Sequence, residues 1–531
     1  MCNNVLEYLE HSAVCFPDKT AYADEFSEIT FSQLEEAAKS VGTYLAKKGA
    51  YKEPVLIYMA KTPVQLTMLF GVVYAGCFYV PIDEEMPANR MKLILETTQA
   101  RFMIYDKENE DKVNSFHFTG QSISCEKCFK AKANAEILQD IRLCSTDADL
   151  LYVLFTSGST GVPKGVAGHH RGVIDYIEQL TQVLNIDEGN IFGNQTPLFV
   201  DACMKEIYST LKCGAATYLI PKEYFMSPVK VVEYLNQYKI NTICWVASAL
   251  SMISAFGTFD VVKPEYLHTV TFGSEVFPVS QFNIWKKELP QARFFNLYGP
   301  TEGTGVCCWH EATRFYKEGE TIPIGKAFKN AHVFLIKEKE NKNVIENKDV
   351  IGNKNVKENK DAQANTYVEA KEGEICIRGT GVTHGYYRNP EKTKEVFVQN
   401  PLHCNYLDLV YRTGDLARWN EQGELEFVSR SDYQIKHMGH RIELGEIEAD
   451  ASMVEGVKSC CCVHIQKNNK ILLYYTGDIE KAKLTKALKE RLPRYMIPNK
   501  MIKLEQMPLL SNGKLDRLKM QEMYMERRTE G

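Results

Sequence analysis

The segment LLYVLFTSGSTGVPKGV, residues 150–166, is the most informative stretch of the chain. Residues 150–156 form an apolar run with the length and composition of a buried β-strand. The loop that follows is rich in glycine, serine and threonine and leads to Lys164. Such a loop can wrap its backbone and hydroxyl groups around a polyphosphate, and the lysine adds positive charge. The P-loop pattern GxxxxGK(S/T) does not fit, because Gly165 follows the lysine. The segment therefore predicts a phosphate-binding loop, with an ordinary loop between strands as the alternative.

Outward from this segment, residues 1–300 alternate strand-like and helix-like patterns. Residues 55–60 (VLIYMA) are strand-like, 62–76 are typical of a helix that ends at glycine, and 78–83 return to a strand. The pattern continues in strand-like runs at 102–106, 150–156, 215–221, 242–247 and 269–274. Strands that alternate with helices predict an α/β fold with parallel sheets covered by helices on both faces.

The pattern changes near Gly325. Shorter alternating strands follow, at 331–337 (AHVFLIK), 373–379 (GEICIRG) and 424–430 (ELEFVSR). They predict a small β-rich subdomain within a large N-terminal region that ends at residue 431. Residues 432–531 carry strand and helix signals of their own, which predicts a small C-terminal α+β domain.

Residues 340–361 form a near-repeat of six residues that is rich in asparagine, lysine and glutamate. The segment has too little apolar mass to bury itself. Because it separates two strand-like runs, we expect a low-complexity insertion in a hairpin loop. A partner-binding tail is the alternative.

Composition limits the classes of function. The chain has 531 residues, of which 44% are hydrophobic and 25% charged, as expected for a globular protein of at least two domains. The formal net charge of −5 argues against broad attraction to nucleic acid or anionic membranes. The N-terminus lacks a signal-peptide pattern, and glycines and a proline interrupt the most apolar stretch, 66–82. We expect a cytoplasmic protein that binds neither nucleic acid nor membrane.

Sixteen cysteines are scattered over the chain. Cys125 and Cys128 form a CxxC pair with no second pair at zinc-ribbon spacing. The consecutive residues 460–462 cannot all face one ion from a regular strand. We expect reduced, mostly buried thiols.

The loop at 156–166 resembles the signature loop of the ANL superfamily, which comprises acyl- and aryl-CoA synthetases, adenylation domains of nonribosomal peptide synthetases and luciferases of the firefly type. The likeness extends to four further motifs in the family's order: NLYGPTE (296–302), YRTGDL (411–416), SRSDYQIKHMGHRIELGEIE (429–448) and MPLLSNGKLDR (507–517). The chain is most similar to stand-alone amino-acid adenylation domains and D-alanine–carrier protein ligases. The resemblance implies that ATP activates a carboxylate as an acyl-adenylate.

The resemblance also implies roles for single residues. A substrate carboxylate must approach the α-phosphate of ATP, so the site must supply cations and fixed donors for the developing charge. Lys514 would be the catalytic ammonium between the two anions, Thr301 would contact the α-phosphate, and Glu302 would ligate Mg²⁺. Asp415 would accept hydrogen bonds from the ribose hydroxyls. The other ATP-binding residues would be Thr156, Ser157, Gly158, Ser159, Thr160, Gly161 and Lys164 in the loop, Asn296, Tyr298 and Gly299 around adenine, and Arg430 near ribose or phosphate.

Residues 197–215 (PLFVDACMKEIYSTLKCGA) resemble the amino-acid-activating branch of the family. In that branch an aspartate pairs with the α-ammonium of the substrate, and Asp201 holds its place. Here Val200 precedes the aspartate, and the usual phenylalanine is displaced to Phe199. A helix N-cap is the alternative role of Asp201.

The same resemblance implies which residues line the side-chain pocket: Lys205, Cys244, Val270, Phe272, Leu297, Gly305 and Val306. Lys205 stands out, because a buried lysine in an apolar pocket is costly unless it is paired. Two alternatives follow. Lys205 either pairs with an acidic or amide side chain of the substrate, or lies on an exposed helix face above a small apolar pocket. Phe272 and Leu297 would shorten the pocket and favour a compact substrate such as alanine, serine or cysteine.

Because Lys514 lies in the small domain, the resemblance implies a mobile lid that rotates about a hinge at Asp432 between two half-reactions. In the second, the thiol of a phosphopantetheine arm attacks the adenylate, and Gly439 leaves room for that arm. Only 17 residues of the 531 follow Lys514. We therefore expect a stand-alone enzyme that loads a phosphopantetheinylated carrier protein in trans, and a monomer suffices to complete the site.

The functional prediction is ATP-dependent amino-acid adenylation with release of pyrophosphate, followed by transfer to a carrier protein. The alternative within enzymes is an acyl- or aryl-CoA ligase that acts on a carboxylic acid without an amino group. A luciferase-like oxidase and a non-catalytic nucleotide-binding protein are the remaining alternatives.

Overall fold

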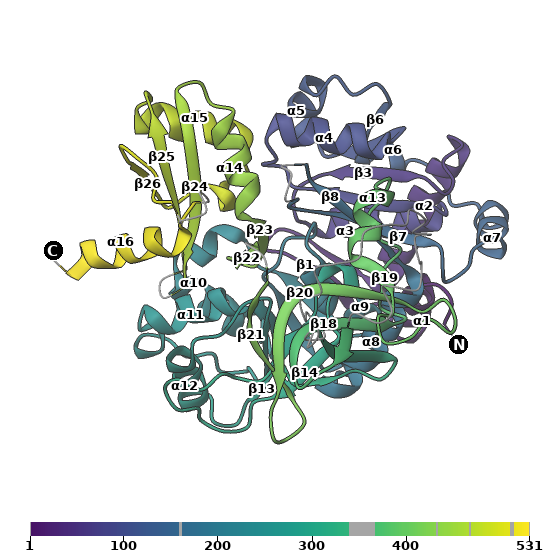
Figure 1. Ribbon diagram of the computed structural model, residues 1–531. Helices are drawn as coiled ribbons and strands as arrows, with labels where there is room; N and C mark the ends of the chain where they lie inside the picture. Colours follow the sequence, from purple (N-terminus) through teal and green to yellow (C-terminus); the bar gives the residue numbers. More distant parts are fainter. Residues whose placement is uncertain are drawn as a thin grey trace.

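The computed structural model describes residues 2–158, 162–338, 367–431, 434–466, 469–509 and 515–529. Figure 1 shows a large N-terminal body of sheets and helices, with the C-terminal part, drawn in yellow and yellow-green, beside it. The β22–β23 hairpin (Gln434–His437 and His440–Glu443) lies where the C-terminal part meets the body.

The first large sheet carries the phosphate loop. Its strands in spatial order are β6 (Gln121–Ser124), β5 (Phe102–Tyr105), β3 (Pro54–Tyr58), β4 (Phe78–Ile82), β7 (Leu150–Thr156) and β8 (Lys164–His169). The strands from β6 to β7 are parallel, whereas β8 pairs antiparallel with β7. Only residues 157–163 connect β7 to β8, too few for the crossover that parallel strands need. The phosphate loop therefore connects two strands that pair antiparallel.

The second large sheet has nine strands. In spatial order they are β15 (Lys326–Ala327), β14 (Cys308–Glu311), β13 (Arg293–Tyr298), β12 (Thr269–Gly273), β11 (Thr242–Val246), β9 (Ile191–Asn194), β10 (Ala216–Leu219), β1 (Thr20–Ala23) and β2 (Glu28–Thr30). The strands from β13 to β1 are parallel, and the pairs at both edges are antiparallel. The predicted α/β fold with parallel sheets is confirmed, with antiparallel edges that the alternating pattern did not predict.

Helices pack on and between these sheets. They are α1 (Leu6–Cys15), α2 (Phe31–Lys47), α3 (Pro63–Tyr74), α4 (Ala88–Thr98), α5 (Glu110–Ser115), α6 (Cys125–Phe129), α7 (Ala135–Leu143), α8 (His170–Leu184), α9 (Met204–Cys213), α10 (Pro228–Gln237), α11 (Ala247–Ala255), α12 (Val279–Glu288) and α13 (Pro390–Val396). Helix α3 starts at a Thr62 cap followed by Pro63, a favourable first helical residue. One core cluster contains Ile57 of the first sheet, Phe192 of the second, and residues of α3, α8 and α9. A common core thus holds the two sheets together.

The predicted β-rich subdomain is an antiparallel sheet. Its strands are β16 (Ala331–Glu338), β17 (Tyr367–Glu369), β18 (Glu372–Gly379), β19 (Phe397–Gln399), β20 (Leu409–Trp419) and β21 (Leu425–Arg430). The low-complexity segment at 340–361 lies outside the described residues. Its flanking strands, β16 and β17, pair antiparallel with Lys337 opposite Val368.

The C-terminal part has cores of its own. Besides the β22–β23 hairpin it contains α14 (Leu444–Ser452), β24 (Val457–Ile465), β25 (Lys470–Gly477), α15 (Lys481–Arg491), β26 (Lys500–Lys503) and α16 (Arg517–Thr529). Ile447, Leu473 and Leu488 are completely buried in one of its clusters. We propose residue 431 as the end of the N-terminal domain, because β21 still pairs with β20 up to Arg430.

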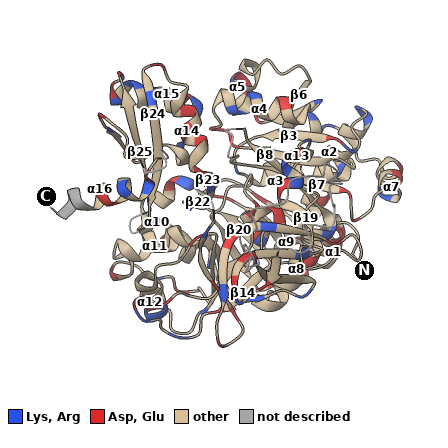
Figure 2. Cartoon of the chain, viewed as in Figure 1, with Lys and Arg blue, Asp and Glu red and all other residues tan. Residues whose placement is uncertain are grey.

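The charged residues and the cysteines are distributed over the whole structure. Figure 2 shows the positions of basic and acidic residues interspersed along the helices and strands. None of the described helices is long and apolar enough to cross a bilayer. All sixteen cysteines are free, and most are buried.

Candidate active site

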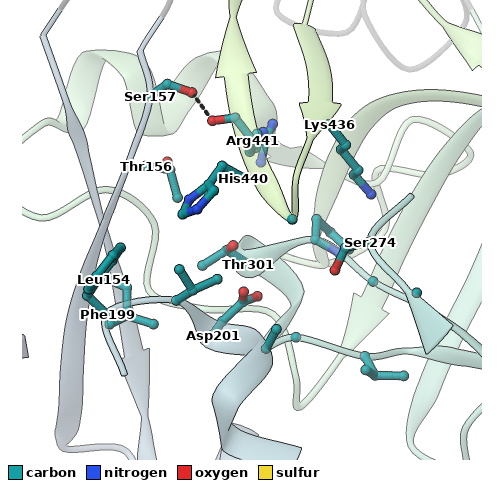
Figure 3. Close-up of a pocket in the computed structure, with 18 of the residues that line it drawn as sticks. Leu154, Thr156, Ser157, Phe199, Asp201, Ser274, Thr301, Lys436, His440 and Arg441 are labelled. Atoms are coloured by element: carbon teal, nitrogen blue, oxygen red, sulfur yellow. Dashed lines mark hydrogen bonds between the residues drawn. The ribbon is translucent and has the colours of Figure 1, made fainter. Parts of the chain in front are cut away.

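A cavity opens where the C-terminal ends of β7, β12 and β13 meet the β22–β23 hairpin (Figure 3). Its space amounts to about 1110 Å³, part of it open to solvent. Ligand sites of α/β folds are found at this end of their strands. Many of the predicted site residues line it together: Thr156, Ser157, Asp201, Lys205, Phe272, Leu297, Gly299, Thr301, Gly305, Val306, Asp415, Arg430 and Gly439.

Asp201 and Thr301 lie side by side in this cavity (Figure 3). Asp201 is the first residue of a short 3₁₀ helix (Asp201–Cys203) that leads into α9, and neither helix has a side-chain cap. The helix-cap alternative for Asp201 is therefore wrong. Burial raises the pKa of the Asp201 carboxyl, partly offset by the Lys205 ammonium and the Thr301 hydroxyl. The carboxylate thus lies in a desolvated place where a cation would stabilise it.

A second acidic residue, Asp415 of β20, marks another side of the cavity. It is 1% exposed, and its Oδ2 accepts a 2.5 Å hydrogen bond from the Tyr298 hydroxyl. Arg430 of β21 donates to the other oxygen. The Lys436 ammonium lies 5.4 Å from the centre of the Tyr298 ring. In this structure Lys436 therefore lies over the ring of Tyr298, the residue predicted to stack against adenine.

Glu302 is completely buried between two donors from different parts of the chain. Its Oε1 accepts a 2.7 Å hydrogen bond from the Tyr386 hydroxyl, and its Oε2 accepts one of 2.5 Å from the Arg441 guanidinium. Burial alone would raise the pKa of Glu302, but the Arg441 and Lys164 charges outweigh it and lower that pKa to about 2. The carboxylate is therefore ionised at all ordinary pH values.

The environment of Glu302 fits the predicted Mg²⁺ ligand. Mg²⁺ is commonly held by one or two carboxylates together with substrate phosphates and water, and needs no protein cage. Among the described residues no group of three or more acidic, histidine or cysteine side chains could hold a metal. The ionised Glu302 carboxylate is an oxygen ligand of this kind, and Mg²⁺ would replace Arg441 at one of its oxygens.

The described part of the phosphate loop binds groups of the lid. The Gly158 amide donates a 3.2 Å hydrogen bond to Oε2 of Glu446, whose other oxygen pairs with Arg90 of α4. The Ser157 hydroxyl donates to the Arg441 backbone carbonyl (Figure 3). Lys164 lies 3.5 Å from Glu443. The groups predicted to bind phosphate thus donate to a carboxylate and to a backbone carbonyl in this structure.

Other predicted residues lie elsewhere. Cys244 and Val270 are completely buried within their strands and do not line the cavity. Asn296 donates its amide to the Ile322 and Pro323 carbonyls instead of facing the cavity. Ser159, Thr160, Gly161, Asp432 and Lys514 lie outside the described residues.

The structure adds residues that the sequence did not single out. Lys436, Arg441 and Glu446 lie within the motif at 429–448, but spacing gave no reason to choose them. Tyr386 and Arg90 lie in no motif, and no sequence signal could have found them. All five contact the predicted site residues or line the cavity.

Comparisons with known proteins identify the family of the chain. The AMP-binding enzyme family matches residues 9–387. Tyrocidine synthase 1 of Brevibacillus parabrevis is 29% identical over 527 residues, which cover 97% of this chain and 44% of that protein. The chain thus spans less than half of that relative. Zwittermicin A synthase ZmaJ of Bacillus cereus is 30% identical over 533 residues, covering 97% of this chain and 94% of that protein.

The fold is shared with the Vibrio cholerae adenylation domain AlmE, solved in complex with glycyl-adenosine-5′-phosphate. That structure superposes with a TM-score of 0.81 at 19% identity, over 99% of this chain and 98% of the other. The family match covers more than half of the sequence, and the motifs follow its order. The chain therefore belongs to the AMP-binding enzyme family, within the ANL superfamily of adenylate-forming ligases.

Proposed function

We propose that this adenylate-forming ligase activates an amino acid. ATP and the amino acid would give aminoacyl-AMP and pyrophosphate, and the aminoacyl group would then pass to the phosphopantetheine thiol of a carrier protein in trans. The adenylation domain AlmE, which shares the fold and was solved with glycyl-adenosine-5′-phosphate, supports this class of reaction.

The observation that carries the proposal is the position of Asp201. Its carboxylate lines the same cavity as Thr301 and Asp415 and caps neither helix that follows it. This half-buried carboxylate has the Lys205 and Lys436 charges near it, but no described lysine or arginine forms an ion pair with it. The α-ammonium of an amino acid supplies such a cation in a charge-assisted contact, whereas a plain carboxylic acid does not.

The remaining residues would neutralise and orient the phosphates. Glu302 would hold Mg²⁺, which when bound neutralises phosphate charge. Thr301 would donate to the α-phosphate, and the loop at 156–164 would bind the β- and γ-phosphates through its amides, hydroxyls and Lys164. The carboxylate of Asp415 would fix the ribose.

We further propose that the lid serves both half-reactions by rotating at Asp432. In this structure Lys436, Gly439, His440 and Arg441 of the β22–β23 hairpin line the cavity, together with Tyr495, while no described residue of 507–517 does. Adenylation would require the opposite arrangement, with Lys514 at the cavity. The hairpin arrangement suits transfer to the thiol.

Paired substrates test the function. Pyrophosphate exchange into ATP is measured with each amino acid and with the corresponding acid that lacks the amino group. We expect exchange with an amino acid only. Asp201→Asn should lower kcat/KM for that amino acid at least about 100-fold, because the buried α-ammonium loses its counter-charge. The control Asp111→Asn removes an exposed carboxylate of α5 and should change nothing. Exchange with plain acids that survives Asp201→Asn would instead favour the CoA-ligase alternative.

A further inference from the structure

Lys205 of α9 faces the cavity next to Asp201. The residue is 8% exposed and lines the cavity, so the alternative that places it on an exposed helix face is wrong. Among the described residues its ammonium forms neither a hydrogen bond nor an ion pair. The Asp201 and Glu206 carboxylates act on its charge from nearby without contacting it. A lysine more than nine-tenths buried that lacks a direct acidic contact is costly, unless a ligand supplies that contact.

A second layer of charge lies behind Lys205. Glu206 is completely buried, and neither of its carboxylate oxygens has a hydrogen-bond partner among the described residues. Burial raises the pKa of Glu206 to about 8, against the opposing effect of Lys205 and Lys61. The Lys61 ammonium donates 3.3 Å hydrogen bonds to the backbone carbonyl and side-chain oxygen of Asn194. Burial lowers the pKa of Lys61 to about 8, so this lysine is still mostly protonated at neutral pH.

The sum of these charges shows which charge the substrate side chain must supply. Asp201 and Glu206 oppose Lys61 and Lys205, so the ionised cluster is neutral before the substrate binds. The α-ammonium of a substrate neutralises Asp201 and leaves one positive charge in excess. If Glu206 is protonated, the excess is larger. An uncompensated charge in a desolvated pocket is strongly unfavourable, and an anionic substrate side chain removes it.

The α-carboxylate cannot provide that compensation. It must approach the α-phosphate beside Thr301, and it loses its charge when the adenylate forms. The neighbouring cations Lys436 and Arg430 lie around Asp415. The charge of Lys436 also acts on Asp201, but the Glu302 carboxylate opposes it there, so the charge count is unchanged. The compensating group must therefore come from the substrate side chain.

The spacing of the two anchors fits such a substrate. Asp201 lies in the short 3₁₀ helix and Lys205 near the start of α9, four residues later, so their backbones are roughly 6–8 Å apart along the axis. Both side chains line the same cavity, so a short dicarboxylic amino acid can contact Asp201 with its α-ammonium and Lys205 with its side-chain carboxylate. Phe272 and Leu297 line the cavity as well.

We propose that Lys205 is a specificity-determining residue that binds a side-chain carboxylate, so that the enzyme activates a 2-amino dicarboxylic acid of the aspartate or glutamate class. This inference rests on the proposed function, because the charge count assumes an α-ammonium at Asp201.

The test compares each acid with its amide. Pyrophosphate exchange is measured for aspartate, asparagine, glutamate and glutamine, and for alanine, serine and cysteine. We expect one dicarboxylic acid to exceed its own amide at least about 100-fold in kcat/KM, because a site built for a charged group rejects the analogue that leaves it unpaired. Lys205→Met keeps the length of the side chain and removes its charge, and it should abolish most of that preference.

The matched control is Lys212→Met on the same helix. Lys212 is paired with Glu178 at 2.8 Å and does not line the cavity, so this change should leave the acid-to-amide ratio unaltered. ATP binding to Lys205→Met, measured by calorimetry, shows whether that variant is folded. Exchange confined to neutral amino acids, or a preference that Lys205→Met retains, would overturn the inference and leave the proposed function standing. Exchange with plain acids alone, or with no acid, would overturn both.

Discussion

The guanidinium of Arg441 in the lid lies 2.5 Å from the carboxylate of Glu302 in the N-terminal domain, across 139 residues of chain. The Glu302 side chain is completely buried in this contact, and the Arg441 side chain is 15% exposed. The carboxylate predicted to ligate Mg²⁺ therefore has a protein cation beside it when the hairpin lines the cavity. Arg441 and the metal would compete for the same oxygen, which couples lid position to the binding of Mg²⁺ and ATP.

Arg441→Gln tests this coupling. Breaking a buried ion pair by removing one partner costs about 3–5 kcal/mol, and Lys164 and Tyr386 would limit the loss to the lower end here. We expect the transfer half-reaction, which needs this lid arrangement, to slow about 100-fold. Adenylation, measured by pyrophosphate exchange, should change less than about 10-fold.

Arg418→Gln is the control for that prediction. Arg418 forms an exposed ion pair with Glu426 on the β-rich sheet, and such pairs contribute at most about 1 kcal/mol. It should affect neither step. Equal losses in both half-reactions of Arg441→Gln would contradict the proposed competition.

We expect Gly439→Ala to prevent the β22–β23 hairpin from lining the cavity as it does in this structure. Gly439 has φ of +80°, and an added Cβ would lie 2.6 Å from Cγ1 of Val246. Its amide also donates a 2.9 Å hydrogen bond to Glu275. We expect transfer to a pantetheine thiol to fall at least about 10-fold while pyrophosphate exchange persists, since left-handed strain and a clash each cost about 1–3 kcal/mol. Single-turnover transfer of the aminoacyl group measures the effect.

The chain offers a matched control in Gly423→Ala. Gly423 has a similar φ of +68°, in the turn between β20 and β21, but an added Cβ meets no atom within 4 Å. It carries the same backbone strain without the contact to Val246. If both variants slow transfer equally, backbone strain alone explains the result. The proposal that transfer requires close packing of Gly439 against Val246 is then wrong.

Much of the fold could be predicted from local sequence, because burial and periodicity are local. The strand at 150–156 was predicted with the observed bounds, and 242–247 and 269–274 differ from β11 and β12 by one residue. The antiparallel edges depend on connection length and tertiary pairing instead. The strand β9 was missed because its four residues, IFGN, include glycine and asparagine, which are poor strand formers.

For the site too, residues within local motifs could be predicted from the sequence, whereas contacts between distant residues could not. Motif residues such as Asp201, Thr301 and Asp415 could be placed because each belongs to a recognisable segment. The contact of Gly158 with Glu446 joins residues 288 positions apart, and the one between Tyr386 and Glu302 spans 84. No local pattern encodes such pairs. Cys244 and Val270 were assigned to the pocket by the family pattern alone, and the structure places both outside its lining.

Glu302→Gln should alter the acid stability of the protein. The pKa of Glu302 is about 2 in the folded state, below the ordinary value of 4.5. The ionised carboxylate therefore stabilises the fold above pH 4.5, and this contribution is lost as the pH falls from 4.5 towards 2. Urea unfolding between pH 5 and 3 should show a shallower decrease for Glu302→Gln than for the wild type. The difference should reach at most about 1.4 kcal/mol per pH unit.

An exposed carboxylate serves as the control for that titration. Glu421 lies in the turn between β20 and β21, and Glu421→Gln should leave the slope unchanged. A wild-type slope in Glu302→Gln would mean that Glu302 is not held ionised by Arg441 and Lys164.

In the proposed reaction this cavity joins a carboxylate to the α-phosphate of ATP. The most direct measurement is exchange of labelled pyrophosphate into ATP by the purified protein, with Mg²⁺ and the twenty amino acids supplied one at a time. We expect exchange that depends on one or a few amino acids and falls at least about 100-fold in Lys514→Ala, since a charge at the transition state is lost. The absence of exchange with every amino acid and carboxylic acid, or full exchange by Lys514→Ala, would contradict it.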